Sequence, residues 1–274
     1  MTLNDTNGTM AIGVAQFAPG DDTAENLRNI RDLATLAAAR GAALVVFPEY
    51  SSFFTPKLGP EAVAAAEPLD GPFVRGLAAL AKVLGVHIAA GMVERVAGDD
   101  ERLSNTVVAV DTAGVVVATY RKQHLYDAFG QRESEFVRAG DIEPPQLFAV
   151  NGFTIGMQTC YDIRFPEATR VLVDAGADVV LVPAEWVRGP LKEQHWRTLV
   201  TARAIENTVY VAAADHAPPI GAGNSMIVDP MGVEIATIGE QSDVAVSWIS
   251  RQRIDSVRET NPALELRRYR VVPR

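Results

Sequence analysis

The sequence predicts an α/β fold in which two sheets pack together and helices cover their outer faces. Apolar strand segments alternate with amphipathic helical segments along the whole chain, and the alternation occurs in both halves. No Gly/Ser-rich linker separates the halves, so a single domain accounts for both. Antiparallel hairpins interrupt the alternation. They argue against an eight-fold barrel, because the strands of such a barrel are all parallel.

The composition is that of an ordinary globular protein, with 48% hydrophobic and 22% charged residues among 274. A chain of this length buries a sizeable core without disulfides, and its single cysteine cannot form one internally. Residues 1–9 are polar and predict a frayed leader, and no apolar run approaches the length of a membrane span. We therefore expect a cytoplasmic enzyme without a membrane partner. The net charge of −9 argues against a nucleic-acid partner.

The first half begins with a strand and an amphipathic helix. Asp22 and Glu25 form a start that resembles a capping box, and the helix extends to about Arg40, where Gly41 ends it. The strand that follows is continuously apolar, which is typical of strands buried on both faces. A polar loop without a clear period covers residues 123–141. Strands are expected at 12–17, 43–47, 87–94, 106–110 and 115–120, with a second helix at 73–84.

The second half repeats the alternation. A hairpin turns at Asn151-Gly152, and a helix follows Pro166. Strands are expected at 147–150, 153–159, 178–183, 209–214, 226–229, 233–237 and 244–249, with helices at 191–207 and 254–258. We expect one domain over residues 10–250. The tail, 251–274, mixes Arg with Leu, Tyr and Val, a composition that usually needs a partner surface.

Three residues with useful chemistry stand at the C-terminal ends of apolar strands: Glu49, Lys122 and Cys160. In α/β proteins this edge is where sites are built. Cys160 lies at a turn between strand and helix, where free N–H groups and the helix dipole favour the thiolate. A lone cysteine is also commonly a small buried apolar residue. The joint placement of all three residues favours a reactive site.

A carboxylate, an ammonium and a thiol in one pocket form a chemically complete set. The carboxylate can accept the thiol proton, the thiol can form a thioester, and the ammonium can stabilise an oxyanion. Four scattered histidines without ligand spacing predict no metal site. No phosphate loop or dinucleotide fingerprint is present, so no cofactor is expected.

Three segments carry a family resemblance: Phe47-Pro48-Glu49-Tyr50, the run from Tyr120 to Asp127, and the run from Cys160 to Glu167. Together they resemble the signature blocks of the nitrilase superfamily of carbon–nitrogen hydrolases. The resemblance implies a four-layer αββα sandwich that forms homodimers. It also implies a Glu-Lys-Cys triad at Glu49, Lys122 and Cys160, with the backbone N–H of Tyr161 as a second oxyanion donor.

The family commonly has a second glutamate in the loop after the lysine. Glu133 is the matching position, and Glu135 is its competitor. The resemblance implies that this glutamate orients Lys122 or the amide of the substrate. The alternative is a solvated loop carboxylate.

The segment Cys160-Tyr161-Asp162-Ile163-Arg164 is similar to the amidase branch, which includes ω-amidases and deaminated-glutathione amidases. These enzymes cleave a terminal carboxamide from a small substrate that also carries a carboxylate. Arg164 suits that carboxylate by bidentate pairing, and its alternative is a salt bridge with Glu167 or Asp162.

Glu185 and Trp186 match a substrate-lining position, although Trp186 is equally compatible with core or dimer packing. The leading hypothesis is a cofactor-free amidase. A nitrilase or a carbamoyl-amino-acid hydrolase with the same triad is the alternative enzyme. A non-catalytic interaction module on the same fold is the third reading.

Overall fold

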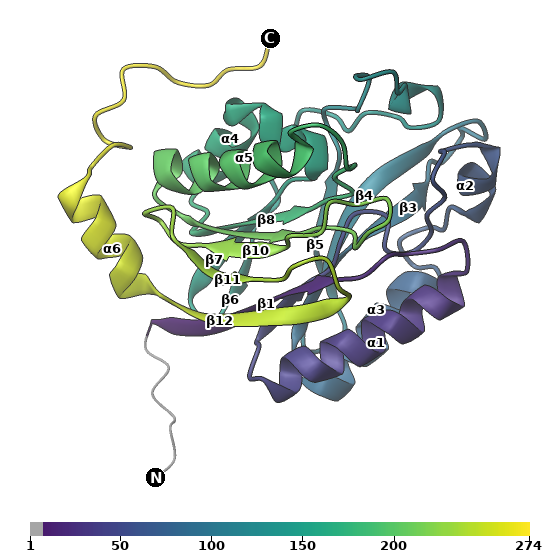
Figure 1. Ribbon diagram of the computed structural model, residues 1–274, viewed down its shortest axis with the longest axis horizontal. Coiled ribbons are helices and arrows are strands. Elements are labelled where there is room, and N and C mark those ends of the chain that lie inside the picture. Colours follow the sequence, from purple (N-terminus) through teal and green to yellow (C-terminus); the bar gives the residue numbers. More distant parts are fainter. Residues whose placement is uncertain (1–7) are drawn as a thin grey trace.

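Two six-stranded sheets pack face to face between two layers of helices in the computed structural model, which describes residues 8–274 (Figure 1). The predicted four-layer sandwich is confirmed. The first sheet has the order β12 (Asp243–Ser250), β1 (Thr9–Gln16), β2 (Leu44–Val46), β3 (His87–Arg95), β4 (Leu103–Val110), β5 (Val116–Arg121). The second has the order β11 (Glu234–Thr237), β10 (Met226–Val228), β9 (Tyr210–Ala214), β8 (Val179–Pro183), β7 (Phe153–Met157), β6 (Phe148–Val150).

Each sheet combines a parallel centre with antiparallel flanks. Strands β1, β2 and β3 are parallel, as are β7, β8 and β9, and the other pairs are antiparallel. The hairpins expected from the sequence form these flanks. Two reversals make β5 parallel to β3, so the C-terminal ends of β2, β3 and β5 lie at one edge of the first sheet.

Helices α1 (Thr23–Ala39) and α3 (Pro72–Leu84) cover the first sheet, and α4 (Pro166–Asp174) and α5 (Lys192–Asn207) cover the second (Figure 1). Helix α1 begins as predicted, because the Asp22 carboxylate accepts hydrogen bonds from the N–H groups of Ala24 and Glu25. Helix α3 ends at Gly85, whose φ of 67° lies in the left-handed region that glycine tolerates.

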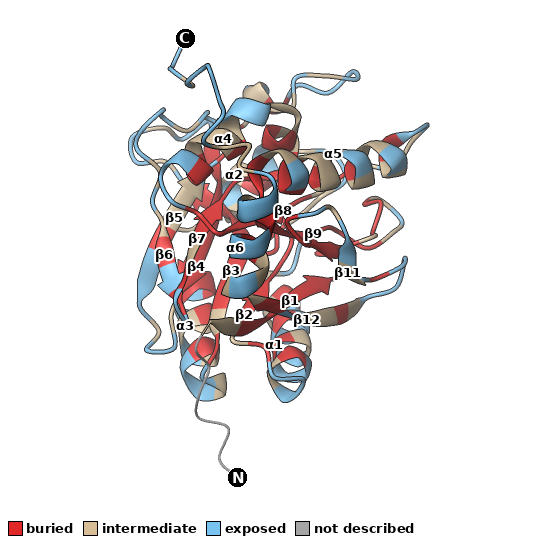
Figure 2. Cartoon of the chain, turned by 90° about the vertical axis from the view of Figure 1, so that its left-hand side faces the viewer, coloured by how far each residue is buried: buried red, intermediate tan, exposed pale blue. Residues whose placement is uncertain are grey.

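The core has three main layers, and each central strand contributes side chains to two of them. On β8, Val179 and Leu181 face the other sheet, whereas Val180 and Val182 face the α4/α5 layer. The central strands of both sheets are therefore buried on both faces (Figure 2). This explains why these central strands are continuously apolar in the sequence and do not alternate with polar residues.

Several elements differ from the sequence-based expectation. Helix α2 (Pro60–Ala65) and the 3₁₀ turn η1 (Glu133–Glu135) were not predicted, because each is too short to show a helical period. Strand β4 begins at Leu103, three residues earlier than predicted, and includes buried polar residues. Helix α6 (Arg251–Thr260) is longer than the expected 254–258. The predicted leader lies outside the described residues up to residue 7, and Thr9 already belongs to β1.

Gly91 on β3 allows the segment after β2 to approach closely. A Cβ atom at this position would lie 2.6 Å from both the Glu49 Cα and the Tyr50 N. The N–H of Gly91 donates to the carbonyl of Pro48 at 3.0 Å. A side chain here would therefore displace the backbone that carries Glu49, in agreement with the close approach that a glycine inside a strand indicates.

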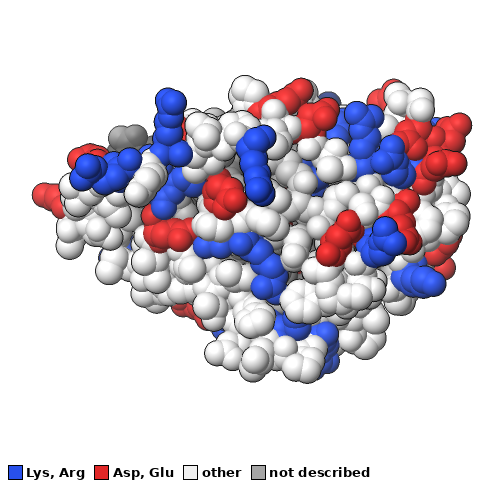
Figure 3. Space-filling view, turned by 90° about the horizontal axis from the view of Figure 1, so that it is seen from above, with Lys and Arg blue, Asp and Glu red and all other residues white. Residues whose placement is uncertain are grey.

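Charged side chains of both signs are interspersed on the face seen in Figure 3. Within residues 8–274, no helix is long and apolar enough to cross a membrane. The chain after α6 forms neither helix nor strand (Figure 1). Leu264 packs against the α4/α5 layer, and Arg267 forms a salt bridge with Asp174 at the end of α4.

Candidate active site

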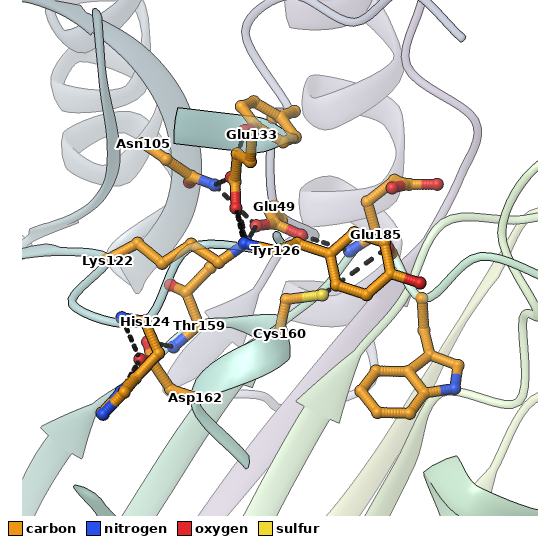
Figure 4. A network of polar contacts seen from close by, with 12 residues as sticks. Glu49, Asn105, Lys122, His124, Tyr126, Glu133, Thr159, Cys160, Asp162 and Glu185 are labelled. Carbon is orange, nitrogen blue, oxygen red and sulfur yellow. Dashed lines mark hydrogen bonds and ion pairs between the residues drawn. The ribbon is translucent and has the colours of Figure 1, made fainter. Parts of the chain in front are cut away.

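The candidate site lies at the ends of strands from both sheets. Glu49 follows β2, Lys122 follows β5, and Cys160 follows β7 by three residues. Glu185 follows β8, the parallel neighbour of β7. Figure 4 shows the side chains of Glu49, Lys122 and Cys160 converging at this edge. The shared strand direction therefore brings together residues that lie as far as 136 positions apart, since the N–H of Glu185 donates to Glu49 Oε2 at 2.7 Å.

The Lys122 ammonium is held between two buried carboxylates. Its Nζ lies 2.9 Å from Glu49 Oε1 and 3.0 Å from Glu133 Oε2. Only 1% of Glu49, 2% of Lys122 and 8% of Glu133 is exposed to solvent. We call these three residues the ion network. Charges in such a site are tolerated only when they are paired and hydrogen-bonded.

Neighbouring polar groups complete the hydrogen bonds of the two carboxylates. The Asn105 amide donates to Glu49 at 2.6 Å and to Glu133 at 3.0 Å. Glu133 also accepts from the Tyr50 hydroxyl at 2.7 Å and from the N–H of Tyr126 at 2.5 Å. These contacts fix the position of both carboxylates with respect to Lys122.

The two carboxylates titrate differently although both are buried. Burial raises the pKa of Glu49 above its usual value, and the nearby Lys122 only partly opposes this. Burial also acts to raise the pKa of Glu133, but Lys122 and the N–H of Tyr126 outweigh it, so the pKa is lowered. Burial would lower the pKa of Lys122, yet the two carboxylates raise it well above its usual value. The network thus combines a fixed cation, a fixed anion and a carboxyl that binds a proton more readily.

Cys160 is the first residue of the 3₁₀ turn η2 (Cys160–Arg164), and its φ of 45° lies in the left-handed region. A residue other than glycine in this region costs about 1 to 2 kcal/mol, so the surrounding structure must hold the turn. Asp162 does so: its carboxylate accepts from the Thr159 N–H at 3.1 Å and from the Tyr120 hydroxyl at 2.8 Å. The side chain of His124 also contacts Asp162, at 2.7 Å.

The helix N-terminus expected to favour the thiolate does not lower the pKa of Cys160. Burial raises the pKa of the thiol well above its usual value, and the Glu49 carboxylate adds to this. The thiol donates weakly to the carbonyl of Glu185, with a sulfur–oxygen distance of 3.5 Å. A thiol in this state needs a base that removes its proton at the moment of reaction.

A cavity of about 300 Å³ opens beside these groups. Its lining includes members of the ion network together with Cys160, Tyr126 and Glu185. The structure therefore brings Glu49, Lys122, Glu133, Cys160 and Glu185 to one cavity, as expected from the sequence.

Arg164 and Trp186 are not part of this cavity lining. Trp186 is buried, and its indole N–H donates to the carbonyl of Lys192 at 2.7 Å, so it packs behind the cavity wall. Arg164 forms no salt bridge with Glu167, Asp162 or any other described residue. Its guanidinium carbon lies 4.7 Å from the centre of the Trp186 ring.

Glu133 and Glu135, the two candidates for the second glutamate, differ clearly in position. Glu133 belongs to the ion network, whereas half of the Glu135 side chain is exposed and its partner is Arg132. Asn105, Tyr50 and Tyr126 also contact the two carboxylates, and none of them was predicted as a site residue from the sequence. Tyr50 follows Glu49 directly, and Asn105 is a polar residue inside an apolar strand, which is the signal that was available for it. No cluster of metal-binding side chains occurs within residues 8–274.

The carbon-nitrogen hydrolase family model matches residues 11–259. The chain belongs to this family. The match includes nearly all of both sheets and every residue of the ion network. The membership shows that the protein is an enzyme that hydrolyses carbon–nitrogen bonds.

The hydrolase is similar to named amidases. A deaminated glutathione amidase from Escherichia coli O157:H7 is 36% identical over 266 residues, which cover 95% of this chain and 98% of the relative. The NitFhit protein of C. elegans has a TM-score of 0.86 at 30% identity over 95% of this chain, which spans 65% of that protein. A mutant amidase from Nesterenkonia sp. AN1 has a TM-score of 0.79 at 26% identity, and the match covers 98% of this chain and 97% of the amidase chain.

Replacing Lys122 by Met should destabilise the hydrolase, with a deficit that depends on pH. Breaking a buried ion pair costs about 3 to 5 kcal/mol, because it leaves an uncompensated charge. Without the ammonium, both carboxyls have raised pKa values in the folded state. Stability then falls as pH rises above their unfolded values of about 4.3. The deficit should therefore be small near pH 4.5 and large at pH 8.

The free energy of unfolding, measured by chemical denaturation at both pH values, tests this expectation. Lys82→Met, which removes an exposed lysine on α3, is the matched control and should change little at either pH. A Lys122→Met deficit of equal size at both pH values would contradict the assigned charges.

Proposed function

We propose that this hydrolase cleaves a terminal carboxamide of a small carboxylate-bearing molecule and releases the acid and ammonia through a thioester on Cys160. The observation that supports this most is that the only thiol of the chain lines the same cavity as a buried carboxylate–ammonium pair. The relatives add support. The Escherichia coli relative is a deaminated glutathione amidase, and the Nesterenkonia amidase has the acetamide moiety of fluoroacetamide covalently added at its active site cysteine.

In the proposed first half-reaction, Glu49 accepts the proton of the Cys160 thiol as the sulfur attacks the amide carbonyl. Lys122 and the N–H of Tyr161 stabilise the oxyanion of the tetrahedral intermediate. The first N–H groups of a helical turn lack acceptors within the turn, which leaves the Tyr161 N–H available. When the carbon–nitrogen bond breaks, Glu49 passes its proton to the leaving nitrogen, and ammonia departs.

In the second half-reaction, a water molecule donates a proton to Glu49 and attacks the thioester carbonyl. The carbon–sulfur bond breaks, the acid is released, and the proton on Glu49 returns to the sulfur. The raised pKa of Glu49 suits a group that accepts and returns a proton in each half-reaction. Glu133 keeps its charge because its pKa is lowered, and it holds the Lys122 ammonium at the oxyanion position.

We also propose that residues 251–274 contribute to an interface with a second copy of the chain. The tail exposes Leu266, Tyr269 and Val272, which a partner surface would cover. Sedimentation should then give about twice the chain mass of 29.5 kDa, and a monomer mass would contradict the interface.

Replacing Cys160 by Ala should lower ammonia release from an amide substrate by about 10³-fold or more, because no other group on the cavity can form the thioester. Ammonia release by the variant and by the wild type, with circular dichroism to establish that both are folded, measures this. The removed sulfur atom has one weak hydrogen bond, so the fold should persist. Turnover by a folded Cys160→Ala variant at the wild-type rate would refute the mechanism.

Replacing Glu133 by Gln should lower kcat by about 10²-fold, because Lys122 loses one of its two anchoring carboxylates at the oxyanion position. Glu135→Gln, two residues away on the exposed side of the same turn, is the control and should stay within about twofold of the wild type. Steady-state kinetics of the two variants decide between the glutamates. Equal effects would remove Glu133 from the proposed machinery.

A further inference from the structure

Asn105 is a polar residue on a face of β4 that otherwise carries apolar side chains. Side chains alternate between the two faces of a strand, so Asn105 shares its face with Leu103, Val107 and Ala109. Val107 and Ala109 pack in the core between the two sheets. Asn105 is completely buried. An amide in such a place is unfavourable unless its polar atoms have partners, so its contacts must account for its presence.

Asn105 contacts all three members of the ion network. Its backbone carbonyl accepts from the backbone N–H of Lys122 at 2.9 Å. Its Nδ2, which carries two N–H groups, donates to Glu49 Oε1 at 2.6 Å and to Glu133 Oε1 at 3.0 Å. In Figure 4 the Asn105 amide and the Lys122 ammonium both point toward the two carboxylates. Among the described residues, only these two donate to both carboxylates.

The two carboxylates fix the orientation of the Asn105 amide. In the reversed orientation, Oδ1 would face the oxygen atoms of both carboxylates, and acceptors repel one another. In the observed orientation, Oδ1 is buried and has no hydrogen-bond donor among the described residues. A buried acceptor without a partner is unfavourable for stability. The amide is therefore better explained by what its N–H groups do for the two carboxylates than by a contribution to packing.

Asn105 supplies hydrogen-bond donors without adding a charge. Lys122 provides one positive charge for two carboxylates, so it cannot neutralise both of them. Glu133 has two further donors besides Lys122 and Asn105. Glu49 has only one further donor, the backbone N–H of Glu185. Glu49 is therefore the carboxylate whose ionised form depends more on the Asn105 amide.

We propose that Asn105 is a positioning residue that keeps Glu49 ionised and aligned as the base of the reaction. This inference rests on the proposed function, in which Glu49 must be ionised to accept the thiol proton. The hydrogen bond from Asn105 acts to lower the pKa of Glu49, against the larger effect of burial. Without the amide, Glu49 holds its proton to a higher pH, and a smaller share of the enzyme has an ionised base.

Titratable groups from every segment packed around Glu49 must be considered in its titration. They are Lys122, Glu133, Cys160, Glu185, Asp215, His216 and the adjacent Tyr50. The pKa values of the lysine, the thiol and the tyrosine are raised well above their usual ranges, so these groups keep their protons in acid. Burial lowers the pKa of His216 to about 4, and Lys122 lowers that of Glu133. Burial raises the pKa of the remaining two carboxyls, but neither is hydrogen-bonded to Asn105, so a shift caused by Asn105 reports on Glu49.

The pH dependence of kcat/KM for an amide substrate tests the inference with Asn105→Leu, which keeps the branched shape and removes both donors. The midpoint of the acid limb should move up by about one pH unit, because a hydrogen bond to a charged group is worth at least that much. On the acid limb, kcat/KM should therefore fall by about 10-fold more than at alkaline pH. Loss of activity by one factor at every pH, with an unmoved midpoint, would show a structural role only and overturn the inference.

Thr106→Val is the matched control. Thr106 is the next residue of β4, and its hydroxyl donates to the buried carboxylate of Glu94 at 2.7 Å. The substitution removes a hydrogen bond to a buried carboxylate outside the ion network, so the midpoint of the acid limb should not move. If Asn105→Leu does not fold, Asn105→Ser replaces it, since a serine hydroxyl has one donor and cannot serve both carboxylates. A folded Asn105→Ser variant should show an upward shift of the same limb, and no shift would overturn the inference.

Alkylation of the single thiol separates this inference from the proposed function. Cys160 is the only cysteine, so the rate of its modification by iodoacetamide can be followed by intact-mass spectrometry across pH without any amide turnover. The acid limb of this rate should also move up in Asn105→Leu and stay in place in Thr106→Val. Such a shift in a protein that hydrolyses no amide would support the inference and refute the proposed function alone. Amide hydrolysis through Cys160 with the same acid limb in Asn105→Leu and the wild type would overturn the inference alone.

Discussion

The buried ion network around Lys122 is the interaction on which the rest of the site depends. One ammonium is held at 2.9 Å and 3.0 Å from two carboxylates, all three nearly inaccessible to water. None of these charges would be stable in this place alone, so the end of β2, the end of β5 and the loop after β5 must meet there. The network also separates the two carboxyls by environment, since the pKa of Glu49 is raised and that of Glu133 is lowered.

The fold supplies the rigidity that such a network needs. The central strands of both sheets are buried on both faces, and the close approach at Gly91 fixes the segment that carries Glu49. On the second sheet, Asp162 holds the strained turn at Cys160. Glu185 joins the two halves, because its N–H binds Glu49 and its carbonyl accepts from the Cys160 thiol. The cavity thus forms where the C-terminal edges of the two sheets meet.

The sequence predicted the layers, and it predicted Glu49, Lys122 and Cys160 as neighbours because each follows an apolar strand in a segment that resembles a family signature block. It did not predict Asn105, whose contact with Glu49 depends on the register of β4 against β3. The turn at Cys160 supplies a helix N-terminus that favours the thiolate, as predicted, but burial and the Glu49 carboxylate outweigh this effect and raise the pKa of the thiol. Neither burial nor the Glu49 charge is visible in a local sequence pattern.

Intact-mass spectrometry of the wild-type enzyme, quenched in acid at short times after mixing with glutaramate, a simple aliphatic amide, a nitrile or a carbamoyl amino acid, tests the central claim most directly. The account predicts that an amide adds the mass of its acyl group to the chain, that the added mass maps to the peptide containing Cys160, and that it disappears as the substrate is exhausted while ammonia accumulates. Ammonia release with the acyl group on another residue, or with no adduct when turnover is slower than the quench, would contradict it.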